Sequence, residues 1–440
     1  MANTYISRTF GTPTNANIWT YSVWIKRSQL GADQCFLAAG TGATDRTEIS
    51  FSGSDYIAVY RNIGGSTAGV ETSELYRDTS GWYNLVFKND NGTMTIYVNG
   101  ETVTQNTSSL GTNRINQASV VHQIGEIVAT GNPFNGSMSY VAFVDGQALT
   151  PSTFGETDSV TGQWKIKTSI VPGGTGFGNN GFLILKNGNT ITDQSSNSNN
   201  WALSSGTLTD TKDCPDNVFA TMNPLDNYYP NFNLAYGNTS VGAGNGPRTY
   251  LLATMGLAPT GKYYWEIKLQ GQSNGASSNS VLFGISQKST DSTTEDLTDG
   301  VASSTVIDGS GRVYVEGSLA GTFGSSYEPS TVMCLAYDAV NNKMYFGKDG
   351  TWLNSGDPTS GSTGTGAFTP TATNGAYNNI YIPCWGVNYN SGYSVAFNFG
   401  NGSFNTSAVS SAGTNASSNG IFEHDVPTGY TALSTKGLNL

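Results

Sequence analysis

Charged residues are scarce in this sequence. They make up 12% of the 440 residues, about half of the share that is usual for a globular domain. The 31 acidic and 20 basic residues give a net charge of −11, and no window clusters Lys or Arg. Binding to nucleic acid phosphates or to an anionic lipid surface needs such a basic cluster. We therefore expect neither nucleic acid nor a membrane as a partner.

Histidine and cysteine are also scarce, with two and four copies. The cysteines form no CxxC pair and have no histidine close in sequence, so a zinc site is not expected. They are Cys35, Cys214, Cys334 and Cys384. Cys334 and Cys384 lie in apolar strand patterns, where cysteine behaves as a small buried hydrophobe. We assign no metal ligand and no cofactor.

Long apolar runs are absent. No stretch reaches the roughly 18 residues needed to span a bilayer, and the first residues lack the apolar core of a secretory signal. We expect a protein that does not insert into membranes and is made in a cytoplasm. It would then reach any exterior by another route, such as assembly into a particle released by lysis.

Glycine is abundant, with 55 copies, and aromatic residues supply 11% of the chain. Disordered chains are poor in aromatics, so disorder is not favoured. Short aromatic and β-branched segments separated by Gly, Ser, Asn and Thr indicate an all-β fold. Because a single core stops growing at roughly 250–300 residues, we expect two or three domains.

Residues 1–150 form the first predicted domain. Alternating apolar and polar residues predict strands at 21–27, 57–60, 82–88, 93–98 and 138–144. Asn91-Gly92 and Asn99-Gly100 are hairpin signals in which glycine takes a positive φ. This ordered set of segments resembles a laminin-G-like jelly roll of the concanavalin A superfamily. The resemblance implies a β-sandwich.

Residues 246–404 form the second predicted domain. Strands are expected at 262–268, 281–286, 332–338, 343–347, 380–385 and 393–399, with a hairpin turn at Asp349-Gly350. The ordered motifs are Gly261–Ile267, Phe283–Ser286, Lys348–Trp352 and Ile380–Trp385. Together they resemble a SPRY domain, itself a bent concanavalin-A-like sandwich. The Gly/Ser/Thr-rich loop 355–368 departs from cellular SPRY domains, so their peptide-binding loops are not transferred.

Residues 151–245 are expected to be an ordered connector with short strands, and residues 405–440 a C-terminal extension. The polar run 193–200 is typical of a flexible linker, but the connector carries too many aromatics to be free in solution. These aromatics are Trp201, Phe219, Tyr228, Tyr229, Phe232 and Tyr236.

Three segments, Asp193–Trp201, Ala220–Asp226 and Val426–Ser434, resemble connector and tail pieces of structural proteins from phages of aquatic bacteria. The resemblance implies a surface-exposed virion protein: a tail fibre, a tail-associated protein or a head-surface protein. Its partners would be other virion proteins, further copies of the chain in a homo-oligomer, and a host surface glycan.

Concanavalin-A-like folds include glycanases, which use two carboxylates roughly 5–10 Å apart. The strand motif Glu-x-Asp-x-x-Glu does not occur. Glu266 stands alone in its strand, and we interpret it as a polar edge or domain-packing residue. Two further groups of acids lie in polar segments that are typical of solvated loops: Glu71 with Glu74, and Glu295 with Asp296 and Asp299. Acids on separate strands or chains remain an open route to catalysis.

The two histidines do not predict a catalytic triad, which needs a histidine with an orienting acid. His122 alternates with apolar residues as in a strand, which favours a structural role. His424 lies between Glu423 and Asp425, where weak metal binding stays open.

Calcium and phosphate sites are not indicated either. Calcium takes six to eight oxygens, usually with several carboxylates. Asp90 and Asp349 begin hairpin turns, and no Asp-x-Asp-x-Asp-Gly run is present, so a calcium ion stays open without named ligands. Gly242–Gly246 lacks the spacing of a phosphate-binding loop.

The sequence therefore predicts an all-β protein with two concanavalin-A-like jelly-roll sandwiches and no enzymatic activity. Its expected function is adhesion of a virion to host envelope glycans, through aromatic faces and Asn, Asp and Gln side chains. No catalytic residue is assigned, and the ligand-binding residues are unknown from sequence. A purely architectural decoration protein and a virion glycan depolymerase are the two alternatives.

Overall fold

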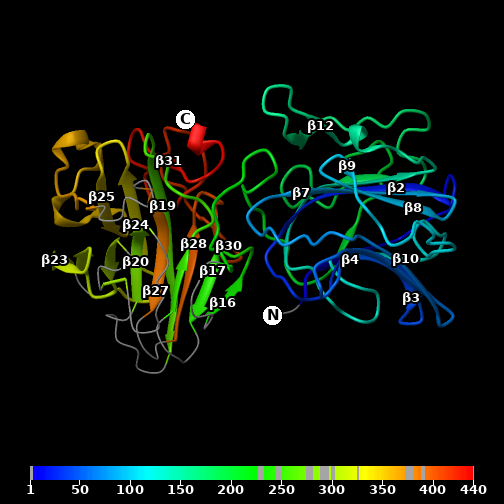
Figure 1. Ribbon diagram of the computed structural model, residues 1–440, viewed down its shortest axis with the longest axis horizontal. Coiled ribbons are helices and arrows are strands. Elements are labelled where there is room, and N and C mark those ends of the chain that lie inside the picture. Colours follow the sequence, from blue (N-terminus) through cyan, green and yellow to red (C-terminus); the bar gives the residue numbers. More distant parts are fainter. Residues whose placement is uncertain are drawn as a thin grey trace. The chain divides into compact units, whose positions relative to one another are not determined.

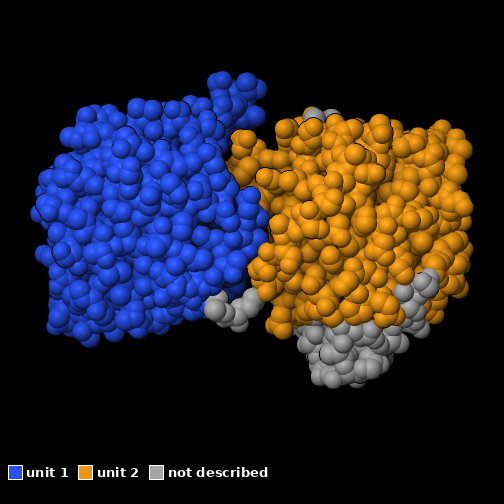
Figure 2. All heavy atoms as spheres, turned by 180° about the vertical axis from the view of Figure 1, so that it is seen from behind, with its two compact units in different colours: residues 1–210 blue, residues 211–440 orange. Residues whose placement is uncertain are grey.

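The chain forms two compact units, Met1–Asp210 and Thr211–Leu440, coloured separately in Figure 2. A computed structural model of the protein describes residues 3–225, 232–243, 249–273, 281–287, 297–298, 303–324, 327–371, 380–387 and 392–439. No α-helix occurs in these ranges, which contain only short 3-10 helices besides strands, turns and loops. None of those helices has the length and hydropathy needed to cross a bilayer.

The first unit is a sandwich of two antiparallel sheets, drawn mainly in blue and cyan in Figure 1. One sheet has the order β15 (Ala202–Ser205), β1 (Tyr5–Thr9), β10 (Val121–Ile124), β3 (Gln34–Gly42), β4 (Asp45–Phe51), β5 (Ile57–Ile63) and β6 (Ser66–Glu71). The other has the order β14 (Phe182–Ile184), β11 (Gly136–Asp145), β2 (Ile18–Arg27), β7 (Tyr83–Asp90), β8 (Thr93–Val98) and β9 (Glu101–Thr102).

Alternation along the strands builds the first core. In β2 the side chains of Trp19, Tyr21, Val23 and Ile25 join the main core cluster, because every second residue of a strand faces the same side. The opposite face of this sheet is also buried, since residues between β11 and β14 cover it. Burial on both faces explains why β2 is buried from Trp19 to Arg27.

The second unit repeats this plan with different strands. One sheet has the order β16 (Phe232–Ala235), β17 (Ser240–Ala243), β28 (Gly392–Asn398), β19 (Lys262–Ser273), β24 (Val332–Asp338), β25 (Lys343–Lys348) and β26 (Thr351–Trp352). The other has the order β18 (Thr249–Leu252), β27 (Ile382–Val387), β20 (Val281–Ser286), β21 (Ser304–Asp308), β22 (Arg312–Val315) and β23 (Ser318–Thr322). The short β31 (Thr431–Ala432) pairs with β19 in parallel.

The C-terminal segment covers the outer face of the second unit's β19–β24–β25 sheet. Trp265 and Leu335 point into the core between the sheets, whereas Tyr264 and Cys334 point to the other side. There they pack with Phe422 and other residues of the C-terminal segment in a separate apolar cluster. Residues 422–432 of this segment therefore form a structural strap over the second sandwich, the C-terminal strap.

The predicted all-β class and the two concanavalin-A-like sandwiches are confirmed. Three strands have the predicted bounds, namely β8, β20 and β24, and the others predicted differ by a few residues. The turns are as predicted: Asn91 and Gly92 have φ of 51° and 86°, and Asp349 and Gly350 have φ of 48° and 78°.

The domain boundaries differ from those expected at 150 and 245. Residues 151–210 belong to the first unit, where β14 pairs with β11 and β15 with β1. The following residues belong to the second unit, where β17 pairs with β28. Backbone pairing thus divides the expected connector between the two sandwiches. Tyr228 and Tyr229 lie outside the described residues.

Candidate functional site

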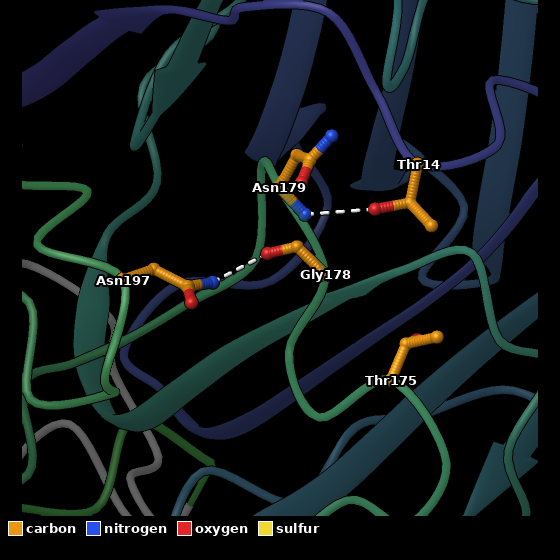
Figure 3. Close-up of a pocket in the computed structure, with 5 residues that line it drawn as sticks. All are labelled: Thr14, Thr175, Gly178, Asn179 and Asn197. Carbon is orange, nitrogen blue, oxygen red and sulfur yellow. Dashed lines mark hydrogen bonds between the residues drawn. The ribbon is translucent and has the colours of Figure 1, made fainter.

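A polar cavity of about 460 Å³, open to solvent, lies at the surface of the first unit. Its lining residues come from three loops, which precede β2, precede β14 and precede β15. They are Thr14, Thr175, Gly178, Asn179 and Asn197, which surround the cavity in Figure 3. The side chains of Thr14, Thr175 and Asn179 are exposed, so a ligand can reach the cavity from solvent.

The buried carboxylate of Asp145, at the end of β11, holds two of these loops. It accepts hydrogen bonds from the backbone N–H of Thr14 at 2.7 Å, Asn15 at 3.2 Å and Asn180 at 3.1 Å. It also accepts one from Asn116 Nδ2 at 2.7 Å. Four N–H donors satisfy this fully buried carboxylate without a basic side chain among these partners. Asp145 therefore fixes the positions of two of the loops that line the cavity.

A second carboxylate, Asp193, shapes the third loop in a similar way. It accepts the backbone N–H groups of Leu183 at 2.9 Å, Ser195 at 2.8 Å and Asn199 at 2.7 Å. The loop then places Asn197 beside the preceding loop, where Nδ2 of Asn197 donates to the carbonyl groups of Gly178 and Gly181. The polar run 193–200, typical of a linker in sequence, is an ordered wall of the cavity.

Only glycine fits at position 178. Its φ is +71°, a region that L side chains rarely adopt. A Cβ atom there would lie 2.1 Å from the carbonyl oxygen of Asp145. The close approach brings the loop onto the end of β11 and leaves room for Asn179, whose backbone N–H donates to Thr14 Oγ1 at 2.8 Å.

His122 belongs to the same buried polar network. Its Nε2 accepts the backbone N–H of Asn116 at 3.0 Å, and its Nδ1 lies 3.1 Å from the carbonyl oxygen of Val120. The ring stacks on Phe10 with the centroids 3.6 Å apart. Burial lowers the pKa of His122 to about 3, so the ring is neutral. Its contacts hold loops together, and it does not line the cavity.

The second unit contains another buried carboxylate with several hydrogen-bond donors, that of Glu266. Its carboxylate accepts the backbone N–H of Glu423 at 2.9 Å and of His424 at 2.8 Å, both in the strap. It also accepts the Tyr264 hydroxyl at 3.0 Å and Asn398 Nδ2 at 3.1 Å. Glu266 is not an edge residue, because β19 lies between β28 and β24 and Glu266 is fully buried. Its bonds to residues 423 and 424 agree with the other part of the prediction, a packing role.

Burial also sets the charge state of Glu266. Removal from water raises its pKa to about 7, although the four donors act in the opposite direction. Burial likewise raises the pKa of the neighbouring Cys334 thiol to about 12. A substrate cannot reach Glu266 while the strap is in place, so this carboxylate holds the strap and is not positioned for general acid catalysis.

The other acids considered from sequence are not brought together. Glu71 ends β6, and Glu74 is exposed in the loop that follows. Glu295, Asp296 and Asp299 lie outside the described residues. Over the described part of the chain, no group of three or more His, Cys, Asp or Glu side chains could hold a metal ion.

Asp349 and Asp425 have local partners. Asp349 accepts the backbone N–H of Val332 at 2.8 Å, and Asp425 accepts that of Thr414 at 2.6 Å. His424, which precedes Asp425 in the sequence, donates its backbone N–H to Glu266 rather than joining a cluster of acids. All four cysteines are unpaired, and Cys35, Cys334 and Cys384 are buried.

Sequence reasoning did not locate the cavity residues. The cavity residues lie in polar loop sequences that look like many others in this chain, at Thr14, Thr175, Asn179 and Asn197. The one available signal in the sequence is Asp145-Gly146, a turn pair directly after the predicted strand at 138–144. A carboxylate at the end of a buried strand needs hydrogen-bond donors, and the adjacent loops supply them.

Residues 2–153 match the family model described as the concanavalin A-like lectin/glucanases superfamily, of the laminin G type. The match covers most of the strands of the first sandwich, including β11 and Asp145. No curated protein matches the sequence.

Several solved structures are similar to parts of the chain. The SPRY domain of human HERC1 is 18% identical over 40% of this chain and 96% of that domain, with a TM-score of 0.31. A putative carbohydrate binding protein from Bacteroides ovatus is 18% identical over 47% of this chain and 59% of that protein, with a TM-score of 0.32. CBM40 of the Ruminococcus gnavus IT-sialidase is 17% identical over 34% of this chain and 95% of that domain, with a TM-score of 0.27.

Proposed function

We propose that the protein binds glycans without cleaving them, and that the cavity of the first sandwich is the binding site. The observation that carries this proposal is the composition of the cavity: two hydroxyls, two amides and a glycine, with no carboxylate among the lining residues. Glycoside hydrolysis requires a pair of carboxyl groups flanking the bond. The family description of residues 2–153 names both lectins and glucanases, which supports a sugar as the ligand.

The proposal extends to a place on the surface of a bacteriophage virion, as a tail fibre, tail-associated or head-surface protein. Its support is the resemblance of three segments, 193–201, 220–226 and 426–434, to phage structural proteins. Single sites of this kind bind weakly, and repeated copies on a particle raise avidity by roughly 10²–10⁴. Partners would then be other virion proteins and further copies of the chain.

The test is a glycan array probed with the full chain, both as isolated protein and clustered on beads. We expect the clustered protein to bind a subset of glycans and the isolated protein to bind the same subset weakly. Asn179→Ala should reduce this binding, whereas Asn106→Ala, at an exposed position outside the cavity, should not. Binding that Asn179→Ala leaves unchanged would place the site elsewhere, and no binding by the clustered protein would favour an architectural role.

The absence of hydrolysis is tested separately. A polysaccharide that the clustered protein binds is incubated with it, and its chain length is followed by size-exclusion chromatography. We expect the length to stay constant. A fall in polymer length would contradict the non-enzymatic proposal and would indicate a depolymerase.

A further inference from the structure

The hydrogen bonds around the cavity show which groups are left for a ligand. Of the lining residues, Thr14, Gly178, Asn179 and Asn197 all use their backbone N–H groups inside the protein. The acceptors are Asp145, the carbonyl oxygen of Thr175, Thr14 Oγ1 and Ser195 Oγ. The cavity therefore offers few N–H donors, which are the groups that bind an anion.

The side-chain amides are oriented in the same sense. Nδ2 of Asn197 donates to two carbonyl groups, those of Gly178 and Gly181. Nδ2 of Asn179 donates to the carbonyl oxygen of Thr12 at 3.3 Å. Asn197 Nδ2 thus uses both of its hydrogens, which leaves Oδ1 of Asn197 for a ligand, whereas Asn179 Nδ2 uses one of two, which leaves Oδ1 and one N–H of Asn179.

No basic side chain lines the cavity. Arg8 contacts the nearby loop, but its Nη1 donates to the carbonyl oxygen of Asn200 at 2.9 Å and its Nη2 to Asn199 Oδ1. The guanidinium is thus directed to the loop itself. A carboxylate, sulfate or phosphate group in the cavity would have no cation to pair with and would lie near the carboxylates of Asp145 and Asp193.

The two carboxylates that support the cavity are also unsuited to a cation. Both oxygens of Asp145 accept two N–H donors each. Both oxygens of Asp193 likewise accept two donors each. Calcium needs free oxygen ligands, and every donor around these oxygens presents a hydrogen to the same space.

From this we infer that the cavity selects uncharged saccharides through their hydroxyl groups, and that it does so without a metal ion. The inference rests on the proposed glycan-binding function and specifies its ligand class. Sugar hydroxyls donate to Asn179 Oδ1 and Asn197 Oδ1, and they exchange hydrogen bonds with the hydroxyls of Thr14 and Thr175. Uronic acids, sialic acids and sulfated sugars are excluded by their charge.

The experiment compares sugars that differ only in charge. Isothermal titration of the full chain uses neutral galactose and glucose trisaccharides and their uronic acid counterparts, at 50 and 500 mM NaCl and with or without EDTA. We expect the neutral sugar to bind at least about tenfold more tightly than its acidic counterpart, because the acidic group finds no cation in the cavity and lies near two carboxylates. Salt and EDTA should each change the neutral affinity by less than about twofold, since no ion pair or metal contributes.

A charge-introducing variant locates the selectivity. Thr175→Lys places a cation at the rim of the cavity and should strengthen binding of the acidic sugar by at least about fivefold. Thr67→Lys, at an exposed position of β6 outside the cavity, is the matched control and should change neither affinity.

The possible failures are distinguishable. Tighter binding of the acidic sugar, weakened by salt, or a tenfold loss in EDTA would overturn the inferred selectivity while leaving a glycan site. Binding of the neutral sugar that neither Thr175→Lys nor Asn179→Ala alters would overturn the inference and the proposed site together. Absence of binding by every sugar of the panel, with the clustered protein as well, would overturn the proposed function itself.

Discussion

The carboxylate of Glu266 accepts the backbone N–H of His424 at 2.8 Å, across 158 positions of the sequence. This hydrogen bond fastens the C-terminal strap to a central strand of the second sandwich. It is one of four that reach the same buried carboxylate. Because burial raises the pKa of Glu266 to about 7, the second sandwich contains a group that titrates near neutral pH.

The stability of the second sandwich is expected to fall as the pH rises. The unfolded carboxyl group has a pKa of 4.5 and the folded one of about 7. The folded state therefore binds more protons in this window. The stabilisation is complete below pH 4.5 and is lost as the pH rises through 7, at about 1.4 kcal/mol per pH unit and about 3 kcal/mol in total. Urea unfolding at each pH, read by pulse labelling of the buried Cys384, measures it.

Glu266→Gln removes this titration. The free energy of unfolding read at Cys384 should then change little between pH 4.5 and 7. Glu423→Gln is the control, because Glu423 is half-exposed and paired with Lys268 at 3.4 Å. An unchanged slope in Glu266→Gln would show that another group dominates the pH response of this unit.

The first sandwich is expected to respond in the opposite direction. Burial lowers the pKa of His122 from 6.5 to about 3, so the unfolded state binds more protons between these values. The stabilisation is complete above pH 6.5 and is lost as the pH falls towards 3, at about 1.4 kcal/mol per pH unit. Labelling of the buried Cys35 in urea reports on this unit.

His122→Gln should reduce the pH dependence of the free energy of unfolding read at Cys35 and leave that read at Cys384 unchanged. His424→Gln is the control and should leave the pH dependence at Cys35 unchanged. The same pH dependence at both cysteines in the unmodified protein would show that His122 and Glu266 do not dominate the pH response of their units.

Asp145→Asn should weaken both the first sandwich and the cavity. An Asn side chain has one acceptor oxygen, so two of the four donors to Asp145 would lose their partner. The expected loss is about 2–4 kcal/mol in urea unfolding read at Cys35, together with reduced binding of the glycan identified on the array. Asp90→Asn, at an exposed hairpin, should retain both stability and binding. Retention of full binding by Asp145→Asn would separate this carboxylate from the site.

Gly350→Val should destabilise the second sandwich only. Gly350 has a φ of +78°, and a Cβ atom would lie 2.8 Å from Nδ1 of His424. A β-branched residue there should lower the free energy of unfolding by about 1–3 kcal/mol. The loss should be seen by labelling of Cys384 and not of Cys35. Gly242→Val, at a strand position with no atom within 4 Å of an added Cβ, is the control in the same unit. Equal losses at both cysteines would contradict independent folding of the two units.

The strands that sequence predicted well are those with strong local patterns. In β24, Met333, Leu335 and Tyr337 face one core, and the hairpin turn that joins β25 to β26 is marked by Asp349-Gly350. Strands such as β3 and β6 were missed. In β3 the sequence Ala38-Ala39-Gly40 has no alternation, and β6 is a largely exposed edge strand with a single fully buried side chain, Val70. Their pairing comes from neighbouring strands rather than from their own residues.

Sequence alone determined the all-β class, the two sandwiches and the positive φ at the hairpin glycines, because alternation and turn chemistry act over a few residues. Only the tertiary structure decided the roles of Glu266, Asp145 and the 193–200 loop. Their partners lie far away in sequence: Glu266 with His424 and Asp145 with Thr14. A buried carboxylate requires donors, but the strands and loops that deliver them are chosen by the packing of the whole sandwich.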